Sequence, residues 1–213
     1  SLADNFIRAG TCRHVLVACS EKLSSRIDGS YDGRNIAILL GDGAGAVVVG
    51  PSPDGKRGIL STSLHADGRF AEALYTAAPG SGLNRTEHLT HEDIDAGRVH
   101  FRMDGKAVFQ NGVGKMSEAI GECLRANGLT IDQIDALVPH QANLRMLEAI
   151  VQKVGIPMSK VFANVEDYGN IASASLPIAL HEARQARLVR PDSLAVLVAF
   201  GSGFVWGSAL IRA

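Results

Sequence analysis

The sequence has little of what marks membrane, secreted or disulfide-rich proteins. Its three cysteines in 213 residues are odd in number and widely spaced, so they build no disulfide framework and favour a reducing compartment. No apolar run approaches the roughly 20 residues that cross a bilayer. The start, SLADNFIRAG, lacks the basic and apolar regions of a signal peptide. We therefore expect a cytoplasmic protein with no membrane partner.

An excess of charge of one sign is lacking too. Lysine and arginine number 21, aspartate and glutamate 22, and the formal net charge is −1. Together with the absence of a run rich in Lys and Arg, this balance argues against nucleic acid as the main partner. The 46% hydrophobic and 20% charged residues are typical of a globular chain, here long enough for one large domain or two small ones.

Apolar runs rich in β-branched residues alternate with helical patterns along the chain. Because strands and helices follow each other with short connections, we expect an α/β fold with a largely parallel sheet. The segment 69–102 is polar and irregular and is interpreted as a surface excursion. The predicted strands are 14–19, 35–40, 45–50, 59–68, 135–140, 160–165, 193–201 and 204–213, and the predicted helices are 104–128, 142–155 and 173–188.

Local signals accompany two of the predicted helices. The apolar residues of 104–128 fall on one helical face, expected to point inward: Phe109, Val113, Met116, Ile120, Cys123 and Leu124. Thr130 and Gln133 have the spacing of a capping box for a short following turn. Gly155, with Pro157 after it, is expected to end the helix 142–155.

Three patterns invite a functional interpretation and fit a structural one better. GDGAGA (41–46) matches a dinucleotide fingerprint, but the strand-like VVV follows it where a helix is required, so a glycine-lined bend is favoured. His88 and His91 lie among carboxylates in the irregular segment, where a solvated loop is favoured over a metal site. None of the cysteines directly precedes a helix whose N-terminus could lower a thiol pKa, so none is predicted to be a nucleophile.

His140 has a stronger claim to chemistry. It stands at the carboxyl end of a predicted strand, where open α/β sheets gather their ligands. Gly169 and Asn170 lie in a second loop that enters a helix, and 199–210 forms a glycine-rich turn after a third strand. An imidazole, a carboxamide and an N–H-lined turn at strand ends together predict a pocket that polarises a carbonyl.

Six motifs together resemble the β-ketoacyl-acyl-carrier-protein synthase III family, the initiating condensing enzymes of fatty-acid synthesis. They are GDGAGAVVV (41–49), LHADG (64–68), MDGKAVF (103–109), VPHQANLRM (138–146), YGNIASAS (168–175) and AFGSGFVWGSALIRA (199–213). The resemblance implies a thiolase-like, layered α/β/α/β/α fold, here incomplete in its N-terminal half. It also implies a division into 1–102, the later part of the first half with the surface excursion, and 103–213, the second half.

The family chemistry implied by the resemblance is a decarboxylative Claisen condensation. A cysteine takes an acyl group from acyl-CoA, with acetyl-CoA the expected donor, and malonyl-acyl-carrier protein then loses CO₂ and attacks it. By resemblance, His140 and Asn170 are catalytic and donate hydrogen bonds to the malonyl thioester oxygen, and the Ser202 backbone N–H belongs to the oxyanion hole. No metal or cofactor is implied beyond the coenzyme A thioester substrate.

The resemblance also implies partners and a missing residue. The family is a homodimer, and its cysteine precedes the residue matched by Ser1, so it is expected on a second polypeptide or on a preceding segment left unobserved. Two alternatives stay open: a related condensing enzyme of secondary metabolism, and a non-catalytic module that binds acyl-CoA or carrier protein. The expected CoA and pantetheine contacts are Arg34, Gly105, Phe109, Ala142 and Asn143, and the expected carrier-protein contact is Arg145.

Overall fold

The computed structural model describes residues 1–52, 54–80 and 85–213. Its helices and strands follow in the order α1 (Leu2–Arg8), β1 (Val15–Lys22), α2 (Arg34–Ala37), β2 (Asp42–Val49), β3 (Gly58–Ala66), β4 (Leu74–Tyr75), α3 (His91–Asp95), β5 (Arg102–Met103), α4 (Gly105–Ala126), β6 (Ala136–Pro139), α5 (Leu144–Val154), α6 (Val165–Tyr168), α7 (Ser175–Gln185), β7 (Leu194–Gly201) and β8 (Val205–Arg212). Short 3₁₀ turns connect several of them.

The central sheet has four strands in the order β3-β8-β7-β6. Only β6 and β7 run parallel, whereas β7–β8 and β3–β8 are antiparallel, so the prediction of a largely parallel sheet is wrong. The reason lies in the connections. A short turn connects β7 directly to β8, and a connection of that length can join only antiparallel strands. Parallel strands need a long crossover, and the one between β6 and β7 includes α7.

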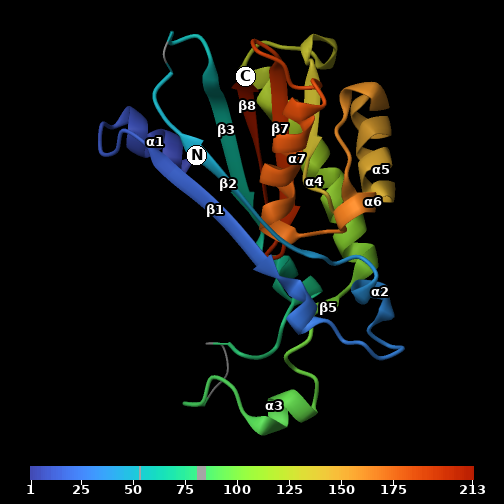
Figure 1. Cartoon of the computed structure of the whole chain (residues 1–213). Coiled ribbons are helices and arrows are strands. Elements are labelled where there is room, and N and C mark those ends of the chain that lie inside the picture. Colours follow the sequence, from blue (N-terminus) through green and yellow to red (C-terminus); the bar gives the residue numbers. More distant parts are fainter. Residues whose placement is uncertain (53, 81–84) are drawn as a thin grey trace.

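The two faces of this sheet are covered by different helices. Alternate residues of β6 and β7 point to opposite sides: Leu137 and Val196 join the core built with α4 and α5, while Ala136 and Ala195 join the core built with α7. Beyond α7 lies the antiparallel ribbon of β1 and β2 (Figure 1). The ribbon, α7, the sheet and the α4–α5 pair form successive layers, as the layered α/β expectation requires.

The glycines of β2 explain why the ribbon and α7 pack closely. GDGAGA does not form the predicted bend, because Asp42 to Ala46 lie within β2 in regular register with β1. A Cβ on Gly45 would stand 2.9 Å from the Pro177 side chain, and one on Gly43 would stand 3.1 Å from that of Ile171. The missing side chains are therefore a packing requirement.

Three local expectations also fail. Residues 35–40 do not form a strand: the short α2 ends at Ala37 and Leu40 makes a single bridge to Asn170. A short apolar run does not distinguish a helical turn from a strand. In 160–165 the strand is reduced to one bridge, between Leu137 and Val161. Phe109 is 37% exposed instead of facing the core, because the buried residues of α4 begin only at Gly112.

The two predicted caps around β6 are confirmed. Thr130 and Gln133 form the capping box of a short 3₁₀ turn before the strand. Gly155 adopts the left-handed conformation (φ +76°) that ends α5. These local signals delimit β6 and α5, the elements on either side of His140.

Candidate active site

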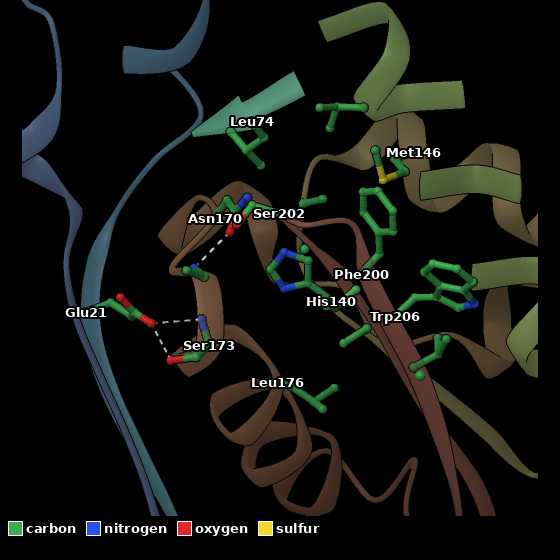
Figure 2. Close-up of a pocket in the computed structure, with 18 of the residues that line it drawn as sticks. Glu21, Leu74, His140, Met146, Asn170, Ser173, Leu176, Phe200, Ser202 and Trp206 are labelled. Carbon is green, nitrogen blue, oxygen red and sulfur yellow. Dashed lines mark hydrogen bonds between the residues drawn. The ribbon is translucent and has the colours of Figure 1, made fainter. Parts of the chain in front are cut away.

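A cavity of about 960 Å³ opens at the carboxyl ends of β6 and β7. Most of its lining is apolar and includes Leu74, Met146, Leu176 and Phe200 (Figure 2). His140, Asn170 and Ser202, the three predicted reactive groups, also line it. The structure thus brings together one residue from each of the three loops that the sequence singled out.

His140 is the first residue after β6, and its backbone continues the parallel ladder. Its N–H donates to the Val198 carbonyl at 2.8 Å, which fixes the residue while its ring lies among the cavity residues (Figure 2). Desolvation lowers the pKa of the imidazole from 6.5 to about 4. The ring is therefore neutral at pH 7 and carries one N–H donor. No protein hydrogen bond occupies its nitrogens among the described residues.

Asn170 is held by its backbone to the segment before β2. Its N–H donates to the Leu39 carbonyl at 2.7 Å, and its own carbonyl accepts from the Gly41 N–H at 3.0 Å. Its side-chain Oδ1 accepts from the Ala172 N–H at 2.9 Å, which assigns Oδ1 and Nδ2. The Nδ2 group is therefore the hydrogen-bond donor that this side chain can offer to a bound ligand.

Gly169 is needed for this close approach. Its φ of +70° is disfavoured for other residues, and a Cβ there would stand 2.9 Å from the Leu39 carbonyl oxygen. Ser202 lies in the turn between β7 and β8, and its N–H donates to no backbone carbonyl among the described residues. The first loop therefore depends on the absence of a side chain at Gly169, and the second leaves the Ser202 N–H without a backbone acceptor among the described residues.

The predicted binding residues divide into two groups. Ala142 and Asn143 line the cavity, and Asn143 also caps α5 by accepting the Met146 N–H at 2.9 Å. The others lie outside the lining: Arg34, Gly105, Phe109 and Arg145, all exposed. Their predicted contacts with coenzyme A or a carrier protein stay predictions.

Arg34 and Arg145 have different surroundings. The Arg34 guanidinium lies over the exposed Tyr31 ring, 3.5 Å from its centroid, and donates to the Tyr31 carbonyl. Arg145 is in the first turn of α5 and has no carboxylate partner among the described residues. Arg34 is thus constrained locally, whereas Arg145 is available to an external anion.

Several cavity residues were missed by sequence reasoning. Glu21 on β1 contacts Ser173, and His65 on β3 stacks on Trp206 and pairs with Glu122 at 2.6 Å. These contacts join segments that are far apart in sequence, so no local pattern announces them. For His65 and Trp206, the only indication in the sequence was that each lies within one of the motifs that carry the family resemblance.

The cysteines are placed as expected for residues without a catalytic role. Cys123 is buried on the inner face of α4, and burial raises the pKa of its thiol. Cys12 is exposed and Cys19 half-buried, and none of the three lines the cavity. Within the described ranges no group of His, Cys, Asp or Glu could hold a metal ion.

The segment around His88 and His91 is more ordered than a solvated loop. His91 begins α3, and Asp93, which is fully buried, forms a capping box with Thr90. Asp93 also pairs with Arg85 and, at 2.9 Å, with Arg98. These partners lower the pKa of the Asp93 carboxyl. His88 and His91 are both exposed, whereas Asp93 is a buried carboxylate paired with two arginines, so the prediction of a solvated loop is wrong for Asp93.

Comparison with known proteins gives a consistent result. Residues 1–68 match the family described as 3-oxoacyl-[acyl-carrier-protein (ACP)] synthase III, and residues 124–213 match its C-terminal part. The chain is 43% identical over 212 residues to the β-ketoacyl-[acyl-carrier-protein] synthase III of Psychromonas ingrahamii, and 43% identical over 216 residues to that of Rhodospirillum rubrum. It covers 62% of each relative, with 100% of its own length matched.

Solved structures show the same relation. The 3-oxoacyl-[acyl-carrier-protein] synthase III of Aquifex aeolicus matches with a TM-score of 0.85 at 38% identity, covering 100% of this chain and 62% of that one. The synthase III of Thermus thermophilus matches with a TM-score of 0.87 at 37% identity, covering 100% of this chain and 63% of that one.

Among the described residues, no helix is both long and apolar enough to span a membrane.

Proposed function

The chain belongs to the 3-oxoacyl-[acyl-carrier-protein] synthase III family, and from this premise we propose that its cavity serves a decarboxylative Claisen condensation. The substrates are an acyl-CoA, with acetyl-CoA the expected donor, and malonyl-acyl-carrier protein. The products are 3-oxoacyl-carrier protein, CO₂ and free coenzyme A, and the reaction initiates fatty-acid synthesis. One observation carries the proposal: a neutral imidazole and a carboxamide donor line one apolar cavity. The predicted thiolase-like fold, confirmed by the structural relatives, supports it.

His140 and Asn170 are proposed to drive the decarboxylation. When the malonyl carboxylate leaves as CO₂, the electron pair of the broken C–C bond delocalises onto the thioester oxygen as an enolate. The N–H of His140 and the Nδ2 of Asn170 donate to that oxygen, and the apolar lining strengthens both hydrogen bonds. Because its pKa is about 4, His140 acts as a neutral donor at pH 7 and keeps its proton.

The carbanion then attacks an acyl group held as a thioester on a cysteine. The Ser202 N–H is proposed to donate to the oxygen of that thioester as a tetrahedral intermediate forms. The thiolate leaves when the intermediate collapses to the 3-oxoacyl product. None of the three cysteines lines the cavity, and membership of the family implies a nucleophilic cysteine N-terminal to these residues.

Substrate binding and assembly complete the proposal. Ala142 and Asn143 contact pantetheine from the cavity wall, and Gly105, Phe109 and Arg34 contact coenzyme A outside it. Arg145 docks the acidic carrier protein. The protein works as a cytoplasmic homodimer without metal or cofactor. Residues 1–102 and 103–213 belong to successive thiolase-like halves, although β3 of the first pairs with β8 of the second.

The chain spans about 62% of the length of the curated relatives it matches, so the test uses the full-length gene product. It measures CO₂ release from carboxyl-labelled malonyl-carrier protein and formation of the 3-oxoacyl product with acyl-CoAs of graded length. Both should appear with acetyl-CoA. Binding without CO₂ release would refute the condensation and favour a non-catalytic module. A strong preference for long donors would favour a condensing enzyme of secondary metabolism.

A further inference from the structure

A carboxylate from the β1–β2 ribbon holds the loop that presents Asn170. Glu21 lies on β1, and its Oε1 accepts the backbone N–H of Ser173 at 3.2 Å and also the Ser173 hydroxyl (Figure 2). The two residues are 152 positions apart. Both line the cavity, and Ser173 stands three positions after Asn170. The contact therefore joins the ribbon layer to the catalytic loop.

The loop contains one strained residue between Asn170 and Ser173. Ala172 has a φ of +40°, in the left-handed region that is strained for a non-glycine residue. Such a conformation persists only where its surroundings enforce it. The Ala172 N–H is the donor to Asn170 Oδ1 at 2.9 Å. This bond couples the orientation of the Asn170 carboxamide to the peptide unit between Ile171 and Ala172, on which the strained Ala172 backbone bears directly.

Other contacts fix the remaining parts of the loop. The backbone of Asn170 is bonded to Leu39 and Gly41, and the N–H of Ile171 donates to the Ser175 hydroxyl at 2.9 Å. These bonds hold the residues before Ala172 and the start of α7 after it. Glu21 holds Ser173, the residue that directly follows Ala172. Ala172 could relax to a less strained conformation only if Ser173 moved, and the hydrogen bonds to Glu21 oppose that movement.

We propose that Glu21 is a positioning residue for Asn170. By holding Ser173, it keeps Ala172 in the left-handed region and Asn170 Oδ1 engaged, so that Nδ2 stays directed at the substrate oxygen. Glu21 touches no reacting atom and acts only through Asn170. The inference rests on the proposed function, since it assigns the purpose of this contact to the decarboxylation step.

Three variants of the full-length protein separate this role from a general effect on folding. Glu21→Ala removes the acceptor, whereas Glu21→Gln keeps a carbonyl oxygen that can accept from both Ser173 donors. Lys22→Ala is the control, because Lys22 is the next residue on β1 and its side chain points to the opposite face. The thermal unfolding midpoint of each variant is measured alongside.

The kinetic readout is CO₂ release from malonyl-carrier protein. Glu21→Ala should lower its kcat about 10- to 100-fold, the range expected for a misplaced catalytic group. Its KM and the rate of acyl transfer from acyl-CoA should change much less. Glu21→Gln and Lys22→Ala should stay within about twofold of wild type. Equal losses in Glu21→Ala and Lys22→Ala, or in Glu21→Ala and Glu21→Gln, would overturn the proposal.

A double-mutant cycle tests whether Glu21 acts through Asn170. Asn170→Ala and the double variant Glu21→Ala/Asn170→Ala should have the same residual rate, because a lost donor cannot also be misplaced. Independent, multiplying losses would show that Glu21 works by another route.

A spectroscopic readout distinguishes failure of this proposal from failure of the proposed function. The Asn170 side-chain amide, identified in ¹H–¹⁵N spectra by its loss in Asn170→Ala, should give one sharp pair of signals in wild type and shifted or broadened signals in Glu21→Ala. If wild type released no CO₂, the proposed function would fail, and these signals would still decide the positioning role. Unchanged signals in Glu21→Ala would refute it.

Discussion

Burial of His140 should make the protein less stable as the pH falls below about 6.5. The imidazole pKa drops from 6.5 in the unfolded chain to about 4 in the fold. Between about pH 4 and pH 6.5 the imidazole binds a proton in the unfolded chain but not in the folded one, so the free energy of unfolding rises with pH across this range. A shift of this size corresponds to about 3 kcal/mol between pH 7 and pH 4, at about 1.4 kcal/mol per pKa unit. The cavity is open, so water reduces the effect and this figure is an upper value.

Comparison with a His140→Gln variant isolates this contribution. The lowered pKa values of Asp42 and Asp67 also make stability fall in acid, but those groups are the same in both proteins. Urea unfolding of the full-length protein at pH 7, 6, 5 and 4 gives the free energy of unfolding of each. The difference between variant and wild type should increase in favour of the variant as the pH falls. A difference that stays constant from pH 7 to pH 4 would refute the desolvation of His140.

Four further predictions follow from the site and its supports. His140→Ala should raise the barrier to CO₂ release by about 3–4 kcal/mol, as for a lost oxyanion donor, while acyl transfer from acyl-CoA survives better; equal losses in both steps would contradict its assigned role. Gly45→Val should destabilise the protein by about 1–3 kcal/mol in urea unfolding, because the added side chain meets Pro177. Arg145→Glu should raise KM for malonyl-carrier protein in a salt-dependent manner and leave KM for acyl-CoA unchanged, as rates at two ionic strengths would show. Cys123→Ala should retain CO₂ release and condensation, since that thiol is buried away from the cavity.

The sequence was most informative where local chemistry determines local structure. The capping box of Thr130 and Gln133 and the left-handed Gly155 are both confirmed. The long helix predicted at 104–128 is also present, because its apolar positions recur with a helical period over many turns. The three reactive groups were found for a related reason, since each follows the end of a predicted strand or precedes a helix.

The sequence was least informative where a distant segment decides the outcome. Phe109 continues the apolar face of α4, and nothing near it in sequence shows that the core begins only at Gly112. GDGAGA has the composition of a turn, yet its glycines serve the approach of α7, more than 125 residues later. Glu21 has no local signal at all, because its partner belongs to another layer.

The apolar surroundings of the cavity have two opposite consequences for the same ring. They make charging His140 unfavourable, which keeps the imidazole neutral at pH 7 and strengthens the hydrogen bond that it can donate. They also make the fold less stable wherever the unfolded chain would protonate that ring. A more polar lining would relieve the acid instability, but it would weaken the donor and raise the pKa together. Acid sensitivity and a neutral donor therefore have one physical cause, and a substitution in the lining that changes one should change the other.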